Sequence, residues 1–306
     1  MKNRIQIYHS LLLLALIILP CSLLWAQDSL QQENRHEPAR KAFGSPIFLN
    51  GQTDVVNIKK TLEFDIQHRF GTLENGANDL FGIFAPSNIR LGLSFTPLNR
   101  LAIGVGISKI IISNPTVDYN LKFKIFQQAR SGGMPVNLVY YGDMGEDTRG
   151  GEFFTKYVHR FSFFHELIIS RRFNSSLSAM VAPMVAHFNS VDTLYSNDIF
   201  GLGIGVKYRV SPMGSVQVGW TQPLNQHDAN KAGKGFQKDA GPKPEFALGY
   251  EVVTSSHCFQ IFFSTYRDIL PQNNLVYNTN TLTTDVGGKS KLGFLVGFNI
   301  TRLWNF

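Results

Sequence analysis

The chain has 306 residues, 43% of them hydrophobic, with 25 phenylalanines and a formal net charge of +7. No run rich in lysine and arginine with interleaved aromatic residues occurs, so the composition argues against a nucleic-acid-binding protein. Only two cysteines are present, Cys21 and Cys258, and the first lies in a leader, so no internal disulfide is expected.

The N-terminus has the pattern of a cleaved secretory signal. Lys2 and Arg4 precede an apolar run from Leu11 to Leu19, and the segment closes at Ala26. We expect cleavage near Ala26, with residues 1–26 as the signal peptide. Cleavage removes two basic and no acidic residues and leaves a charge of +5, a mild excess that suits an anionic surface bearing lipopolysaccharide.

From residue 61 to the end, apolar and polar residues alternate with the period of β-strands. No stretch after residue 26 approaches the ~20 consecutive apolar residues of a membrane-spanning helix, so a chain this apolar would cross a membrane as a closed β-barrel. Twelve strands are predicted, at 62–69, 89–95, 101–108, 117–125, 136–141, 158–171, 177–188, 200–210, 215–221, 245–253, 257–266 and 291–306.

The connections between these strands alternate in length, as they do in outer-membrane barrels, where short periplasmic turns pair with long extracellular loops. The short set is 96–100, 127–135, 172–176, 211–214 and 254–256. The long set is 71–86, 142–157, 189–197, 222–244 and 267–290, with 111–116 as its one short member. The sequence therefore predicts an all-β fold, an antiparallel transmembrane β-barrel of about twelve strands over residues 61–306, in the bacterial outer membrane.

Residues 27–60 precede the alternating pattern and are rich in polar residues at first. We expect a flexible periplasmic N-terminal extension whose second half docks elsewhere on the protein. A secreted soluble barrel is the alternative to a membrane barrel. It would turn the apolar residues inward and place Glu63, Lys122 and Lys207 on the outside.

The last strand ends on a terminal aromatic residue. Phe298, Ile300, Trp304 and Phe306 share its outward face, which resembles the sorting signal that the barrel-assembly machinery recognises in outer-membrane proteins. We therefore predict that machinery and outer-membrane lipid as partners. Arg302 shares the same face and should extend to the membrane interface.

Two glycine-rich segments, 104–109 and 201–205, look superficially like nucleotide-binding loops. Their glycines sit at every second position of a predicted strand, whereas a phosphate loop must lead into a helix. We interpret them as small inward-facing residues that leave room for bulkier neighbours or for strong curvature of the strand. The histidines form no metal-binding spacing, so no cofactor and no metal site is predicted.

A lumen's lining determines what passes through it. The side chains predicted to line it are Glu63, Asp65, Arg69, Arg90, Asp118, Lys122, Lys124, Lys207, Arg209 and Glu245. With Glu166 and Glu251 included, six basic residues face six acidic ones, so no charge selectivity is predicted. Because about twelve strands lies between the eight that side chains fill and the sixteen of open porins, the strand number fits both an open and a filled lumen.

One local group could support hydrolysis. His187, Ser190 and Asp192 lie where a strand enters a long outer loop, and a hydrolase needs a histidine near a nucleophile and a carboxylate. No Gly-x-Ser-x-Gly motif occurs in the chain. We prefer to interpret His187 as a polar residue where a strand leaves the membrane, so no catalytic residue is predicted.

Three segments, 62–71, 88–94 and 257–264, resemble a β-barrel family of Bacteroidota without an assigned activity. The resemblance spans most of residues 43–306 and implies compartment and architecture, not chemistry. Our leading hypothesis is a passive pore or a conduit for solute or lipid. The alternative is a non-conducting structural barrel, or one that binds a partner through its outer loops, and an outer-membrane hydrolase comes third.

Overall fold

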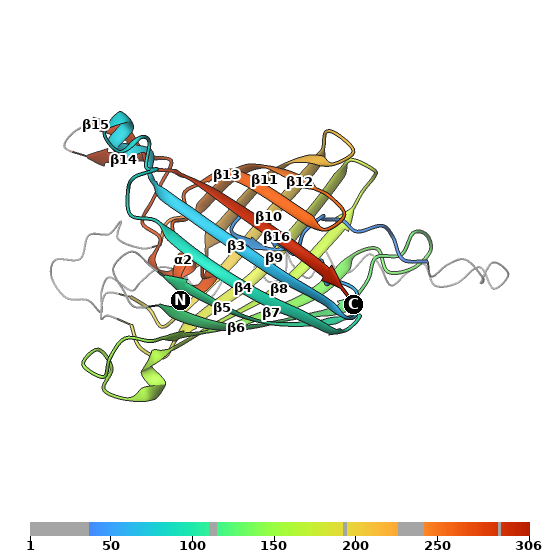
Figure 1. Ribbon diagram of the computed structural model, residues 1–306, viewed down its shortest axis with the longest axis horizontal. Helices are drawn as coiled ribbons and strands as arrows, with labels where there is room; N and C mark the ends of the chain where they lie inside the picture. The colour runs from blue at the N-terminus through green and yellow to red at the C-terminus, as the bar shows by residue number, and fades with distance from the viewer. Residues whose placement is uncertain (1–36, 110–114, 192–194, 226–241, 287–288) are drawn as a thin grey trace, which may run out of the picture.

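The computed structural model describes residues 37–109, 115–191, 195–225, 242–286 and 289–306. Twelve antiparallel strands close into a barrel, which confirms the predicted fold and strand number (Figure 1). Within these ranges no helix is long and apolar enough to cross a membrane. The barrel strands are β3 (Thr61–Thr72), β4 (Asn88–Leu98), β5 (Leu101–Lys109), β6 (Thr116–Phe126), β7 (Asn137–Asp147), β8 (Phe161–Arg172), β9 (Leu177–Phe188), β10 (Asp198–Arg209), β11 (Gly214–Pro223), β12 (Glu245–Val253), β13 (His257–Ser264) and β16 (Leu295–Asn305).

Each strand pairs with its neighbours in sequence, except that the ring is closed by β16 against β3. The two ends of the barrel differ as predicted. Connections of two to ten residues lie at one end, which we call the short-turn end, where β16 also finishes. The long connections lie at the other end, the long-loop end. They carry η2 (Leu73–Asp79), η3 (Tyr157–Arg160), α2 (Pro271–Tyr277) and the hairpin of β14 (Thr283–Val286) and β15 (Lys289–Leu292).

The two faces of the wall have opposite character. Apolar side chains at every second position are exposed on the outside, as at Leu93 and Val105, while the alternate polar positions are buried inside. This arrangement is the predicted one, and it shows that the soluble alternative is wrong. Glu63 and Lys122 are buried, and the outside of the barrel is an apolar belt suited to lipid.

Some strand boundaries differ from the prediction. β7 continues to Asp147, six residues beyond the predicted end, because pairing with β6 and β8 extends it through a stretch where glycines and acidic residues interrupt the apolar alternation. The last strand begins at Leu295 and not at 291, because residues 289–292 pair with 283–286 in the outer hairpin.

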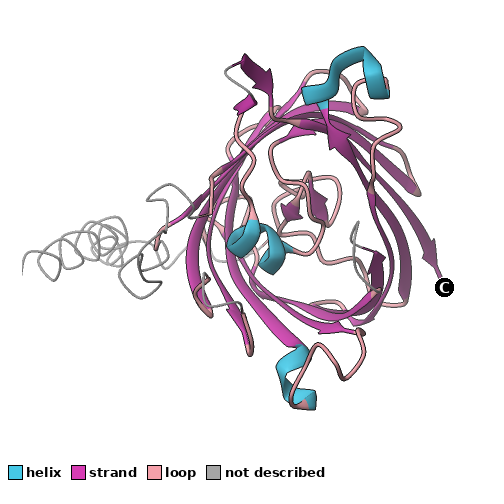
Figure 2. Ribbon diagram, turned by 90° about the vertical axis from the view of Figure 1, so that its left-hand side faces the viewer, coloured by secondary structure: helices cyan, strands magenta, loops and turns pink. Residues whose placement is uncertain are grey.

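A short hairpin lies inside the barrel. β1 (Ile47–Phe48) and β2 (Gly51–Gln52) pair with each other and with no strand of the wall. Figure 2 shows them within the ring of strands, and the chain enters and leaves at the short-turn end. The second half of the predicted extension therefore docks in the lumen, and we call residues 42–57 the plug.

The positions that face outward allow a prediction of how a charged side chain in the apolar belt changes the stability of the barrel. Val105 is the central residue of β5, between Leu93 and Tyr119 on the neighbouring strands. We expect Val105→Arg to lower the free energy of unfolding in phospholipid vesicles by about 2–4 kcal/mol, because arginine is costly near the bilayer midplane. The control is Ile58→Arg at the short-turn end, with an expected loss below about 1 kcal/mol. Equal losses in reversible urea titrations would contradict the assigned lipid face.

Candidate functional site

The lumen wall is built from the inward positions of the twelve strands. Eight of the ten predicted lining residues are buried there: Glu63, Asp65, Arg69, Arg90, Asp118, Lys122, Lys124 and Glu245. The other two, Lys207 and Arg209, border a pocket at the short-turn end, where Lys207 is half-buried and Arg209 is exposed.

An ion triad joins three strands in the lumen. The Arg90 guanidinium donates to Asp65 Oδ1 at 2.9 Å and, through Nη2 and Nε, to both oxygens of Asp118 at 2.7 and 2.8 Å. All three side chains are almost fully buried. A Cβ at Gly92 or Gly106 would collide with this triad, so these inward glycines provide its space. Gly106 belongs to one of the two segments whose glycines were predicted to face inward.

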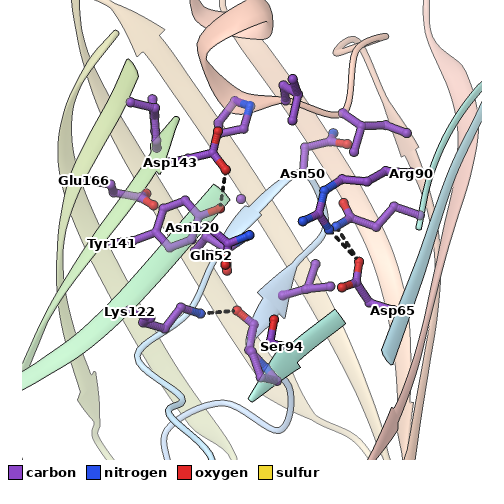
Figure 3. Close-up of a pocket in the computed structure, with 18 of the residues that line it drawn as sticks. Asn50, Gln52, Asp65, Arg90, Ser94, Asn120, Lys122, Tyr141, Asp143 and Glu166 are labelled. Atoms are coloured by element: carbon purple, nitrogen blue, oxygen red, sulfur yellow. Dashed lines mark hydrogen bonds and ion pairs between the residues drawn. The ribbon is translucent and has the colours of Figure 1, made fainter. Parts of the chain in front are cut away.

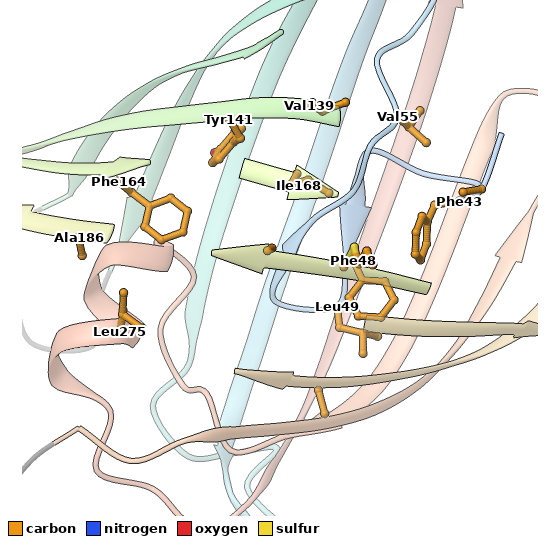
Figure 4. Packing of buried hydrophobic residues seen from close by; sticks show 14 of the residues in the cluster. Phe43, Phe48, Leu49, Val55, Val139, Tyr141, Phe164, Ile168, Ala186 and Leu275 are labelled. Carbon is orange, nitrogen blue, oxygen red and sulfur yellow. The ribbon is translucent and has the colours of Figure 1, made fainter. Parts of the chain in front are cut away.

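The plug presents apolar side chains to glycines of the wall. Phe48 packs on Gly205 and Gly219, and Leu49 packs on Gly249, where a Cβ would lie 2.6 Å from Leu49 Cδ2. Phe43 stacks edge-on against Phe48 with ring centroids 5.5 Å apart (Figure 4). The predicted role of the wall glycines, to leave room for bulkier neighbours, thus falls largely to residues of the plug.

Polar side chains of the wall bind the main chain of the plug. The buried carbonyl groups of the plug need hydrogen-bond donors, because most of the plug is not part of a sheet. The donors are Lys122 Nζ to Pro46 O at 2.9 Å, Gln260 Nε2 to Ile47 O at 2.9 Å, and Asn299 Nδ2 to Leu49 O at 2.8 Å. All of these contacts are non-covalent, so the plug is held by many exchangeable bonds.

Asn50, at the turn of the hairpin, makes a second set of contacts. Its Nδ2 donates to Glu245 Oε1 at 2.7 Å and to Ser264 Oγ at 2.6 Å, and its Oδ1 accepts from Arg69 Nε at 2.6 Å. The Arg69 guanidinium also lies 4.7 Å from the centre of the Phe262 ring. Two predicted lining residues, Arg69 and Glu245, therefore bind the same side chain of the plug.

Helix α2 enters the lumen from the long-loop end. Gln272 Nε2 donates to Asp143 Oδ1 at 2.8 Å, and Leu275 packs against Gly201 on β10. Between α2, the plug and the wall remains a cavity of about 80 Å³, next to Lys122, Tyr141 and Asp143 (Figure 3). This space holds only a few water molecules. In the described part of the chain, the plug thus fills the lumen from the short-turn end and α2 from the long-loop end.

Sequence reasoning missed the place of the plug and of α2. A signal for the plug was present, because apolar residues cluster just before the first barrel strand at Phe43, Ile47, Phe48, Leu49, Val55 and Val56. The inward glycines on β10, β11 and β12 were the matching signal on the wall. Nothing comparable marks α2, which is half polar.

In the possible hydrolytic group, His187 contacts residues other than Ser190 and Asp192. Its Nδ1 lies 2.7 Å from Asp198 Oδ1 and its Nε2 lies 3.1 Å from Asn189 Oδ1, so both ring nitrogens are engaged. No hydrogen bond joins His187 to Ser190 in the described part of the chain, and Asp192 lies outside the described residues. The partner of His187 is therefore the neighbouring strand's aspartate. Asn189 lies at the second ring nitrogen, so in this conformation neither nitrogen faces a nucleophile.

The residues of the predicted assembly signal lie at the end of β16 and just after it. Phe298 and Ile300 are half-buried, while Trp304 and Phe306 are exposed at the short-turn end. The Arg302 guanidinium lies 5.4 Å from the centre of the Trp304 ring. Recognition of this segment by the assembly machinery stays a prediction. Within the described residues no cluster of three or more His, Cys, Asp or Glu side chains has the geometry to hold a metal ion.

An apolar outer belt, a closed antiparallel ring and a charged interior filled by the chain itself define a plugged membrane β-barrel. The family model described as membrane bound beta barrel domain (DUF5777) matches residues 43–304, and the chain belongs to this family. The match begins inside the plug, so the family domain includes the plug as well as the wall. The resemblance seen in the sequence is thereby confirmed as to architecture, and an origin in Bacteroidota stays a prediction.

No curated protein matches the sequence. Among solved structures, the NanC porin has 10% identity and a TM-score of 0.48, with 79% of this chain and 99% of that chain covered. An outer-membrane channel from Pseudomonas putida F1 has 11% identity and a TM-score of 0.45, over 82% and 97% of the two chains. The KdgM porin has 5% identity and a TM-score of 0.46, over 80% and 99%.

The triad gives a prediction for stability. Arg90→Gln would leave two buried carboxylates without their cation, and we expect a loss of about 3–5 kcal/mol in the free energy of unfolding. Adding Asp65→Asn and Asp118→Asn to this variant should restore part of that loss, because the unpaired charges are then gone. Urea titration in vesicles measures both. A triple variant as unstable as the single one would show that the charges are not coupled.

Asp54 in the plug gives a prediction for pH. Burial raises the pKa of this carboxyl above its ordinary value of 3.8, against the opposing effect of Lys124. A raised pKa in the docked state means that docking is most favourable below pH 3.8 and weakens as pH rises through the raised value. The pH window thus begins at the ordinary value and extends upward.

The buried thiol of Cys258, which Ser45 of the plug contacts, reports on docking. We expect its labelling by a membrane-impermeant maleimide to speed up with pH more steeply in wild type than in Asp54→Asn, from about pH 4 upward. The intrinsic reactivity of the thiol cancels in the ratio of the two rates. A ratio that is constant with pH would contradict the role of Asp54.

Proposed function

We propose that the protein is a passive pore of the outer membrane for small polar solutes, closed by its own plug. The observation that carries this proposal is that the plug fills the lumen through non-covalent contacts with a wall that is itself polar and charged. Water or a polar solute can replace each of these contacts in turn. A wall built only to be filled could be apolar.

The dimensions of the wall fit this function. About twelve strands form a ring wider than the eight-stranded barrels that side chains fill completely. Here an entire segment of chain, and not wall side chains alone, is needed to fill the space. Displacement of the plug would therefore expose a lumen lined by residues such as Lys122, Glu63 and Gln260.

A non-conducting barrel is the second candidate, and helix α2 favours it. Leu275 and Val276 are fully buried from the long-loop end, so release of the plug alone leaves one obstruction in place. Such a barrel would act through its outer loops. Conductance separates the two candidates.

Several features of the sequence support the outer membrane as the site of action. The N-terminal segment has the pattern of an export signal, and the last strand ends on outward aromatic residues. We propose outer-membrane lipid, lipopolysaccharide and the barrel-assembly machinery as its surroundings and partners. The mildly basic charge suits that membrane.

A variant that displaces the plug tests the pore. At Gly219 a Cβ would lie 3.2 Å from the Phe48 ring and 3.7 Å from Leu49 Cδ1, so Gly219→Leu occupies the seat of the plug. We expect this variant, refolded into planar bilayers, to give discrete conductance steps far more often than wild type. The matched control is Val218→Leu, which adds bulk to the lipid face of the same strand and should behave as wild type.

A locked plug gives the reverse test. Ser45 contacts Cys258, so Ser45→Cys supplies a second thiol for a disulfide between plug and wall. We expect oxidation to abolish any wild-type conductance and reductant to restore it. If Gly219→Leu folds, as judged by heat-modifiable gel migration, and yet stays silent, the pore is refuted and the non-conducting barrel is favoured.

A further inference from the structure

A second pocket lies at the short-turn end, on the outer side of the plug. Its volume is about 350 Å³. One side is formed by the first residues of the plug and its approach, 41–46, and the other by the ends of β8, β9 and β10 and the turn after β12. The plug and the wall therefore share this pocket.

Four cationic side chains border it: Lys41, Arg172, Lys207 and Arg209, which we call the basic vestibule. In the described part of the chain, no carboxylate oxygen lies within 4.0 Å of a side-chain nitrogen of these four residues, so none of them forms an ion pair. The one carboxylate that lines the pocket belongs to Glu251, and its Oε2 accepts from Gln260 Nε2 at 2.9 Å. The vestibule thus concentrates positive charge that the protein does not neutralise.

Two of the four cations, Arg172 and Lys207, are held in place, although they lack counter-charges. The Arg172 guanidinium donates to the carbonyls of Asn174 at 2.9 Å and of Lys41 at 3.4 Å. Lys207 Nζ lies 5.3 Å from the centre of the Phe43 ring in the plug. Ser176 and Ser178 add hydroxyl groups to the same wall. Preorganised cations beside hydroxyl donors form the chemistry that recognises phosphate and carboxylate groups.

The four cations of the vestibule repel one another electrostatically. Arg209 and Arg172 lie close enough to Lys207 to act on its charge, and Arg40 acts on Arg172. Asp54 and Glu251 are the carboxylates that act on Lys207 from the plug and the wall. Both acids lie on the inner side, so the opening of the pocket remains positive.

We propose that the basic vestibule binds a small multivalent anion that carries phosphate or carboxylate groups. The ligand sits between the root of the plug and the ends of the strands, and neutralises Lys41, Arg172 and Arg209 together. A volume of about 350 Å³ is at the lower limit of ordinary small-molecule pockets and suits a compact solute. This site does not depend on conduction, because it is complete while the plug is docked.

Isothermal titration of the refolded full chain with pyrophosphate, at constant ionic strength, tests the site. We expect saturable binding that Arg172→Gln combined with Arg209→Gln weakens by about tenfold or more, since charge-assisted bonds are lost. The matched control is Arg100→Gln combined with Arg130→Gln, which removes the same two positive charges from side chains in turns at the same end and should leave affinity within about twofold. Heat-modifiable migration verifies that each variant is folded.

Two further arms define the ligand. Glucose, an uncharged solute, should give no binding. Titration in nanodiscs of phosphatidylcholine and of phosphatidylglycerol separates a free anion from a lipid headgroup, because only a headgroup that occupies the vestibule reduces pyrophosphate affinity in the anionic disc. Absence of pyrophosphate binding, or equal binding by wild type and the double variant, overturns the site. Neither result bears on the conductance of Gly219→Leu, so the two proposals fail separately.

Discussion

A barrel in a membrane must turn its apolar side chains outward, and every polar side chain of its strands is then forced into a narrow interior. The rest of this structure depends on that inversion. Charges in such an interior are costly unless they are paired, because little water remains to solvate them. The triad of Arg90 with Asp65 and Asp118 pairs three of them within the wall. The plug satisfies many of the others.

The irregular shape of the plug follows from the same constraint. Only four of its residues are in strands, so most of its backbone groups need partners from outside. The wall carries amide and ammonium donors on strands far apart in sequence, such as Lys122 on β6 and Asn299 on β16. Plug and wall therefore satisfy each other's hydrogen-bonding groups, and burial of either surface without the other would be unfavourable.

The sequence predicts the wall well and its filling poorly, for a physical reason. Alternation with period two is local, so it can be read from neighbouring residues such as Ile103, Gly104 and Val105. The place of residues 42–57 depends on contacts with strands that follow more than a hundred residues later, as between Leu49 and Gly249. Strand boundaries were predicted wrongly where the alternation of apolar residues stops but strand pairing continues, as in the second half of β7. Eight of the ten predicted lining residues are buried inside because the same alternation places them, whereas their individual partners could not be derived.

The attachment of the plug at both ends has a consequence for its kinetics. Before the plug, Pro38 pairs with Ala129 in the turn after β6, and after it only residues 58–60 separate Asn57 from the start of β3. That second tether spans at most about 14 Å when fully extended. A plug that leaves the lumen therefore remains a loop clamped across the mouth, and its return is an intramolecular event at an effective concentration on the order of millimolar. Reclosure then follows first-order kinetics, independent of how many copies the membrane holds.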